Sequence, residues 1–143
     1  MVRFLDSAVL APVFVGDHPH HEASIRLHKD CSKENDWCAV HSLAEVYSTL
    51  TRLPHPQKAT PAQALECIEN IGGRLKLVSL EGDEYRSVTA DAASRPLVDG
   101  TIYDALIAKC ALKVGADIIF TWNIRHFQRL GVEVAKRTQT PSL

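Results

Sequence analysis

The stretch Gly100-Thr101-Ile102-Tyr103-Asp104-Ala105-Leu106-Ile107-Ala108 places one carboxylate in the first turn of an otherwise apolar helix. Apolar residues recur at helical spacing, at Ile102, Ala105, Leu106 and Cys110, so we expect one face of this helix to be buried. We expect Thr101 to cap the helix and Asp104 to occupy its third position, where free backbone N–H groups and the helix dipole keep a carboxylate ionised. Such a carboxylate can bind a hard cation, although for this stretch alone a variant capping box is the simpler explanation.

The chain has the size and composition of one globular domain. Its 143 residues are 45% hydrophobic, which suffices for one core but not for two domains, so we assign residues 1–138 to the domain and 139–143 to a frayed tail. The formal net charge of -1 excludes a general attraction to nucleic acid or membranes, so any nucleic-acid contact must be local. A charged residue soon after the start and the lack of a long apolar run predict a cytoplasmic protein without a membrane span.

Cysteines and histidines give no clear metal-binding pattern. The four cysteines, Cys31, Cys38, Cys67 and Cys110, have no paired spacing, so we expect reduced thiols. A zinc site could be imagined from His18, His20 and His21 with the first two of these cysteines. The spacing fits no zinc motif, and a polar loop that caps the second helix is the simpler explanation.

Strands and helices alternate along the chain. We predict strands at residues 2–5, 37–40, 75–80 and 117–121, with a last edge strand at 132–135. We predict helices after Asp6 and at residues 21–29, 42–53, 61–71, 81–93, 101–114 and 123–130, with Gly72 and Gly73 ending the fourth. This alternation predicts an α/β domain of three layers around a mostly parallel central sheet.

Oxygen-bearing side chains lie at the predicted junctions between strands and helices. Asp6, Glu45, Asp104 and Asn123 all follow or adjoin buried strands, whose carboxyl ends form the ligand-binding edge of a parallel sheet. Each has a second explanation as a helix cap, including a Ser42-Leu-Ala-Glu45 capping box. Three acids gathered at one edge repel one another, and Mg²⁺ or Mn²⁺ would relieve that repulsion. Phosphodiester hydrolysis is the reaction that fits such a site best.

Four short motifs, spread over nearly the whole chain, occur in the order typical of one known protein family. They are Phe4-Leu-Asp-Ser-Ala-Val-Leu10, Ser42-Leu-Ala-Glu-Val-Tyr47, Ile102-Tyr-Asp-Ala-Leu-Ile-Ala108 and Phe120-Thr-Trp-Asn-Ile-Arg-His-Phe127. With these motifs the chain resembles PIN-domain ribonucleases, and most closely the VapC-like toxins of type II toxin–antitoxin systems.

The resemblance implies an α/β/α sandwich with divalent-metal-dependent endoribonuclease activity. Asp6, Glu45 and Asp104 fall on the acidic positions of the family, and Asn123 falls on its fourth position, which is Asp or Asn. Asp6 and Asp104 would be the principal ligands of Mg²⁺ or Mn²⁺, with Glu45 completing the site or orienting a water. The resemblance also implies a homodimer, an RNA substrate and a cognate antitoxin protein.

Two departures from the family keep a second function open. The opening motif is commonly Asp-Thr-Asn or Asp-Thr-Ser, whereas this chain has Asp6-Ser7-Ala8, which removes a polar group that could orient Asp6. An amide at Asn123 also lowers the negative charge of the site. The alternative is therefore a catalytically weak PIN-like domain that binds RNA or protein. A phosphate-accepting receiver domain is disfavoured, because Asp6 has no acidic neighbour.

Basic and aromatic residues suggest how RNA could be held. A local rim could be formed by Arg52, Lys58, Arg125 and Arg129, with Trp122 as a stacking surface. His41 and His126 flank the proposed site and are candidates for phosphate contact, or for ordinary hydrogen-bonded histidines. A solvated face is the alternative for the basic residues.

Overall fold

The computed structural model describes residues 1–142, and five strands in this range form one sheet. The strands are β1 (Arg3–Leu5), β2 (Asp36–Ala39), β3 (Lys76–Val78), β4 (Ile118–Phe120) and β5 (Thr138–Gln139). Their order is β3-β2-β1-β4-β5, and each neighbouring pair is parallel. Because all strands run in one direction with β1 at the centre, their carboxyl ends share one edge of the sheet.

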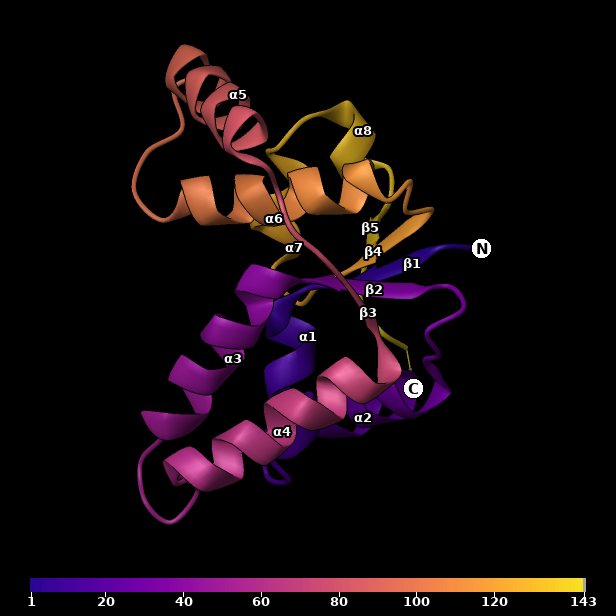
Figure 1. Cartoon of the computed structure of the whole chain (residues 1–143), viewed down its shortest axis with the longest axis vertical. Helices are drawn as coiled ribbons and strands as arrows, with labels where there is room; N and C mark the ends of the chain where they lie inside the picture. Colours follow the sequence, from indigo (N-terminus) through magenta and orange to yellow (C-terminus); the bar gives the residue numbers. More distant parts are fainter. Residues whose placement is uncertain (143) are drawn as a thin grey trace.

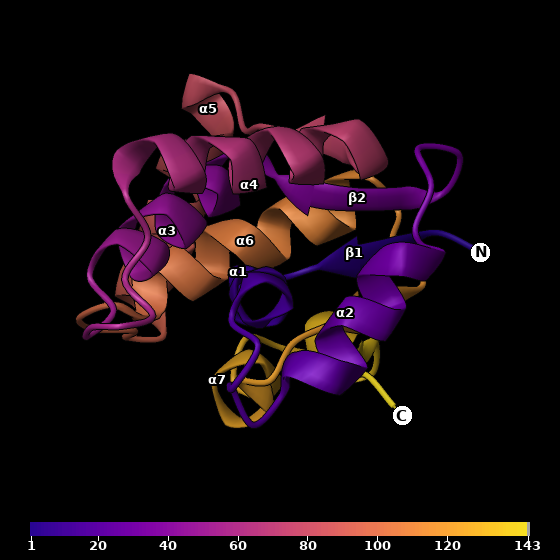
Figure 2. The ribbon, with the colours of Figure 1, turned by 90° about the horizontal axis from the view of Figure 1, so that it is seen from below.

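Helices cover both faces of the sheet, which confirms the predicted α/β/α sandwich (Figure 1). One layer contains α1 (Ser7–Leu10), the 3-10 helix η1 (Ala11–Phe14), α2 (His21–Asp30), α3 (Val40–Thr51) and α4 (Pro61–Arg74). The other contains α5 (Gly82–Ser94), α6 (Thr101–Lys113), α7 (Ile124–Gln128) and α8 (Val132–Ala135). Figure 2 shows α3 and α4 side by side in the first layer. No helix within residues 1–142 is both long and apolar enough to cross a membrane.

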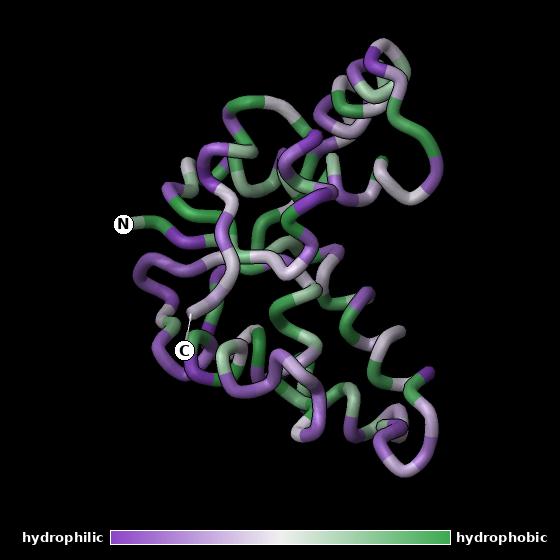
Figure 3. Tube along the Cα trace, turned by 180° about the vertical axis from the view of Figure 1, so that it is seen from behind, coloured by the Kyte–Doolittle hydropathy of each residue, from purple (hydrophilic) through white to green (hydrophobic). Residues whose placement is uncertain are grey.

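Each face of the sheet has its own hydrophobic core. Leu5 packs with residues of α1, α3 and α4, whereas its neighbour Phe4 packs with residues of α6, α7 and α8. Both side chains are fully buried, because successive residues of a strand point to opposite faces. Burial of a side chain of this size contributes about 1.5–3 kcal/mol to stability. Figure 3 shows the hydrophobic segments running through the centre and hydrophilic segments on the loops.

The prediction of an edge strand at 132–135 is wrong, because these residues form the single turn of α8. The Ala135 N–H donates to the Gly131 carbonyl at 2.9 Å, which is helical bonding. Alternation over four residues cannot separate a strand from one helical turn. The edge strand is β5, where Gln139 pairs with Phe120. Part of the predicted tail 139–143 therefore lies in the sheet, and Pro141 is buried, while Leu143 lies outside the described residues.

Two residues predicted as helix caps lie inside their helices instead. Helix α3 begins at Val40, so Ser42 lies inside its first turn and the predicted Ser42–Glu45 capping box is wrong. Helix α6 begins at Thr101, which forms no cap, so Asp104 is its fourth residue rather than its third. The backbone of Gly100 is already helical, which moves the boundary ahead of Thr101.

The fourth predicted helix has the expected start and a later end. The Thr60–Gln63 capping box is confirmed, since Gln63 N–H donates to Thr60 Oγ1 at 3.2 Å and Thr60 N–H donates to Gln63 Oε1 at 2.9 Å. The helix continues through Gly72 and Gly73 to Arg74, so these glycines do not end it. Ile71, which is fully buried, anchors this last turn against the core.

Candidate active site

Asp6 leaves the carboxyl end of the central strand β1 and lies almost completely buried. It is 3% exposed, and its Oδ2 accepts a hydrogen bond of 2.7 Å from Thr121 Oγ1. Its own N–H donates to the Phe120 carbonyl at 2.9 Å, which fixes the backbone beside β4. The side chain makes no capping bond to α1, so the explanation of Asp6 as a helix cap is wrong. The carboxylate is thus held in place without serving the helix.

Thr121 is a positioning residue that the sequence argument missed. It is fully buried directly after β4, and its hydroxyl accepts the Asn123 N–H at 3.0 Å while donating to Asp6. One hydroxyl therefore ties the Asp6 carboxylate to the loop that carries Asn123. The strand register reveals this contact, because Leu5 pairs with Phe120 in parallel. The residues that follow them, Asp6 and Thr121, must then be neighbours.

Glu45 projects from α3 towards the same edge and is only partly exposed. Its Oε1 is buried without a hydrogen-bond partner among residues 1–142. Burial raises the pKa of Glu45, and the charge of Asp104 adds to this rise, while His41 opposes it. A buried carboxylate oxygen without a partner is costly, unless a ligand supplies the missing interaction.

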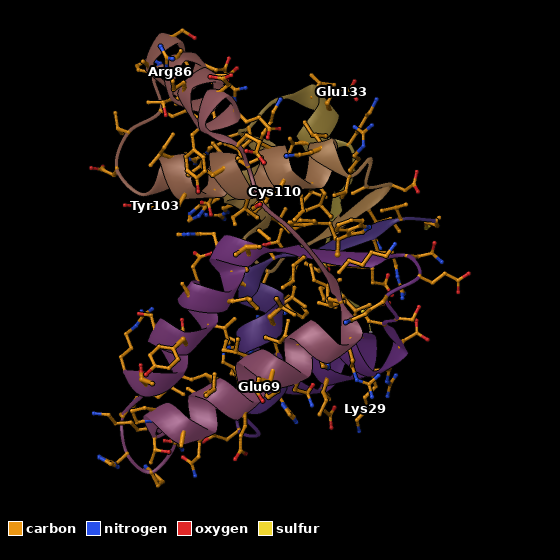
Figure 4. The ribbon with its side chains drawn as sticks, in the orientation of Figure 1. Lys29, Glu69, Arg86, Tyr103, Cys110 and Glu133 are labelled. Atoms are coloured by element: carbon orange, nitrogen blue, oxygen red, sulfur yellow. The ribbon has the colours of Figure 1, made fainter. Side chains whose placement is uncertain are left out.

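Asp104 approaches from α6, on the other side of the sheet from α3. Its Oδ2 lies 3.4 Å from His126 Nδ1, a residue of α7. Burial raises the pKa of Asp104, and His126 opposes the rise. Tyr103, labelled in Figure 4 at the beginning of α6, stacks on His41 of α3 with ring centroids 6.0 Å apart. These pairs link the beginnings of α3, α6 and α7 around the carboxylates.

The three carboxylates lie close enough to influence one another. Burial raises the pKa of Asp6 to about 6, with the charges of Glu45 and Asp104 adding to the rise and the Thr121 hydrogen bond opposing it. The three acids thus lie at one edge of the sheet, as the sequence predicted. Within residues 1–142 no three His, Cys, Asp or Glu side chains are grouped so that they could hold a metal ion. The oxygen donors, their repulsion and the unpartnered Glu45 oxygen nevertheless fit a hard cation.

The histidine-rich loop has no arrangement for zinc. His18 Nδ1 accepts the His20 N–H at 3.0 Å, and His21 Nδ1 lies 2.8 Å from the Pro12 carbonyl oxygen. His20 stacks on Trp122. Helix α2 has no side-chain cap at His20, so the predicted capping role of this loop is wrong.

A cleft of about 800 Å³ opens beside Glu45, between α3 and the segment that follows β1, whereas Asp6 and Asp104 do not line it. Ser7, Glu45 and Asn123 lie on its wall, as do two residues predicted for RNA binding, Arg52 and Trp122. The other basic residues of the predicted rim, Lys58, Arg125 and Arg129, do not line it. Asn123 is exposed and makes no side-chain cap on α7, so its amide is free to face the cleft.

Ala8 also lines this cleft. The missing polar group at this position does not leave Asp6 unoriented, since Thr121 holds that carboxylate. The departure from the family pattern at Ala8 therefore leaves the placement of Asp6 intact.

The chain matches the PIN domain family over residues 3–133. Ribonuclease VapC40 of Mycobacterium tuberculosis (strain CDC 1551 / Oshkosh) is 31% identical over 132 residues, which cover 90% of this chain and 94% of that protein. The crystal structure of Mycobacterium tuberculosis VapC20, a Sarcin-Ricin loop cleaving toxin, has a similar fold with a TM-score of 0.71 at 14% identity, covering 92% of this chain and 98% of the other. The crystal structure of VapBC2 from Rickettsia felis, bound to a DNA fragment from their promoter, has a similar fold with a TM-score of 0.68 at 17% identity. The match covers 99% of this chain and 100% of the other.

Proposed function

Because the chain belongs to the PIN domain family and resembles its VapC ribonucleases, we propose that it is a divalent-metal-dependent endoribonuclease and the toxin of a toxin–antitoxin pair. The observation that carries this proposal is the convergence of Asp6, Glu45 and Asp104 at the carboxyl edge of a parallel sheet. The 31% identity with a protein named as a ribonuclease extends over nearly the whole chain and supports the same chemistry.

Asp6 and Asp104 would hold Mg²⁺ or Mn²⁺, and Glu45 would complete the coordination or orient a water. When bound, such an ion supplies a water of lowered pKa and neutralises charge on a phosphoryl oxygen. Glu45 has an unpartnered, buried Oε1 and a raised pKa, so it is suited to accept a proton from the attacking water. Thr121 keeps Asp6 in position, and the exposed amide of Asn123 is available to a substrate oxygen.

The partners of the protein follow from the same family membership. An antitoxin protein would block the site, and the similarity to VapBC2 from Rickettsia felis supports such a partner. We further propose a homodimer that acts in the cytoplasm on RNA.

The test is cleavage of a labelled mixed RNA pool by purified protein with Mg²⁺, Mn²⁺ or EDTA. Asp6→Asn and Asp104→Asn should abolish metal-dependent cleavage, whereas Glu69→Gln should leave it unchanged. Glu69 is an exposed acid of α4, in the opposite helix layer from α6 (Figure 4). If the folded wild type cuts with neither metal, or if the Asp variants cut as well as the wild type, the nuclease assignment is wrong. RNA binding without cleavage would then favour the catalytically weak binding module.

A further inference from the structure

The imidazole of His126 lies beside Asp104 and has no part in the reaction proposed above. Its Nδ1 is 3.4 Å from Asp104 Oδ2, and the two side chains come from different helices, α7 and α6. Within residues 1–142 neither side chain has another ion pair or side-chain hydrogen bond. The His126 side chain is 60% exposed and that of Asp104 only 22%, so the imidazole covers the carboxylate from its outer side. The contact engages Oδ2 of Asp104 and leaves Oδ1 for a ligand.

Helix α7 fixes the place from which this imidazole reaches α6. Phe127, the next residue, is fully buried and packs with Ile107 of α6 in the core on that face of the sheet. The N–H groups of His126 and Phe127 donate to the Asn123 carbonyl at 3.1 and 3.2 Å. Figure 1 shows α7 beside α6. His126 therefore approaches Asp104 from a short helix that both the core and the preceding turn hold in place.

The turn before α7 also leads back to Asp6. Thr121 Oγ1 donates to Asp6 Oδ2 at 2.7 Å and accepts the Asn123 N–H at 3.0 Å. The Asn123 carbonyl in turn accepts the N–H of His126, whose imidazole lies at Asp104. A continuous series of contacts thus joins the two carboxylates that we propose as principal metal ligands. A segment that contacts both carboxylates sets how they face a common ligand.

We propose that His126 is a positioning residue, whose Nδ1–H donates to Asp104 and holds this carboxylate towards a divalent cation shared with Asp6. The inference rests on the proposed function for its assignment of a cation to these acids. One neutral tautomer of imidazole carries a proton on Nδ1, so the contact does not need a charged ring. Hydrogen bonds from outside the coordination shell orient a ligating carboxylate, and their loss typically lowers metal affinity about 10- to 100-fold.

The position of His126 favours this role over a contact with phosphate. His126 does not line the cleft beside Glu45, although Asn123 of the same turn does. The ring nitrogen nearer the backbone already faces Asp104. His126 therefore acts through Asp104 rather than on the substrate.

Binding of Mn²⁺ is the direct test, because it does not depend on catalysis. Free Mn²⁺ is measured from its electron paramagnetic resonance signal in the presence of each protein, without RNA. His126→Ala should weaken Mn²⁺ binding about tenfold. His55→Ala, at an exposed histidine of the loop between α3 and α4, should bind Mn²⁺ as the wild type does. Since the His126 side chain is mostly exposed, His126→Ala should shift the melting temperature of the metal-free protein by no more than about 3 °C.

Two amide substitutions test which ring nitrogen is needed. The amide nitrogen of Asn is as far from the backbone as Nδ1 of His, whereas that of Gln reaches the place of Nε2. His126→Asn should therefore restore Mn²⁺ binding, and His126→Gln should bind Mn²⁺ as weakly as His126→Ala.

Cleavage at increasing Mn²⁺ concentration separates positioning from contact with RNA. In a positioning role, His126→Ala raises the Mn²⁺ concentration for half-maximal cleavage about tenfold and leaves the rate at saturating Mn²⁺ nearly unchanged. A loss of rate that persists at saturating Mn²⁺ would show that His126 acts on the substrate, and would overturn the inference.

The inference is also overturned if the wild type binds no Mn²⁺, or if His126→Ala binds it as His55→Ala does. Failure of His126→Asn to restore binding, or equal restoration by His126→Gln, would reject the role of Nδ1. Cleavage of RNA by the wild type is measured separately. Metal-dependent cleavage without an effect of His126 on Mn²⁺ binding would uphold the nuclease and reject the inference. The effects on Mn²⁺ binding without any cleavage would uphold the inference and reject the nuclease.

Discussion

Replacing Asp6 with Asn should stabilise the metal-free protein at neutral pH, although it removes a proposed catalytic group. The pKa of Asp6 rises from 3.8 to about 6 in the folded protein, chiefly through burial. A raised carboxyl pKa means that folding favours the protonated form. The contribution of Asp6 to stability is therefore highest below pH 3.8, falls as the pH rises through about 6, and is constant above that value.

The magnitude follows from this difference in pKa. A shift of about two pKa units corresponds to about 3 kcal/mol at pH 7.5. Asn keeps the shape and an oxygen that can accept the Thr121 hydroxyl, but a neutral acceptor is weaker by about 1 kcal/mol. Asp6→Asn should thus gain about 2 kcal/mol, or about 4–8 °C in melting temperature for a chain of this size.

Urea unfolding in EDTA at pH 7.5 and pH 4.5 measures this effect. The advantage of Asp6→Asn should shrink by more than half at pH 4.5, because the wild-type carboxyl is then largely protonated in the folded state. Glu69→Gln, an exposed acid-to-amide change, should show no such dependence. A less stable Asp6→Asn at pH 7.5, or an advantage equal at both pH values, would refute the conclusion that the fold holds this carboxylate at a cost.

Three further substitutions test other parts of the structure. Thr121→Val should lose about 1–3 kcal/mol of stability and most cleavage, because it leaves Asp6 Oδ2 and the Asn123 N–H without their partner. Thr121→Ser should restore stability in unfolding assays and activity in cleavage assays. Asp36→Ala should lose about 3–5 kcal/mol of stability, since Arg3 binds both oxygens of this buried carboxylate. The refolded variant should still cleave normally, because Asp36 begins β2 at the end of the sheet opposite the three site carboxylates. Burial, aided by the charge of Arg74, lowers the pKa of His28 to about 4. The contribution of His28 to stability should therefore fall as the pH drops from 6.5 through 4. Urea unfolding of His28→Leu at several pH values should not show this fall.

The sequence predicted the features that depend on local periodicity. The layer order, the parallel sheet and the convergence of the acids follow from where apolar runs stop, and the structure has all three. The start of α3 and the turn of α8 could not be derived in this way. Four alternating residues fit either a helical turn or a strand, and the true boundary is set by tertiary packing.

The role of Thr121 depends on strand register, which apolar periodicity does not give. Thr121 is adjacent to Asp6 only because Leu5 pairs with Phe120. A shift of one residue would turn Thr121 to the other face of the sheet. Similarly, His20 lies more than 100 positions before Trp122, and their stacking arises only when the start of α2 and the loop after β4 are folded together.

Residues suited to cap helices and residues suited to bind metals are chemically alike, and the side-chain contacts in the structure show which of them cap. Capping boxes do occur, at Thr60 with Gln63 and at Glu81 with Glu84, both at the starts of helices. By contrast, the helices that begin beside the carboxylates have no side-chain cap at their first turn.

Since capping contributes about 1 kcal/mol at each helix start, the fold forgoes that stabilisation at four neighbouring helices. It also holds one carboxylate with a raised pKa and another with an unpartnered oxygen at the same edge. Helices α2 and α8 also begin without a side-chain cap, so the missing caps do not by themselves distinguish this edge. The buried Asp6 and the unpartnered Glu45 oxygen both lower stability there, and this cost is the basis for proposing that the carboxylates serve binding. If so, Mn²⁺ should raise the melting temperature of the wild type, and Asp6→Asn should lose that response while keeping its own higher baseline.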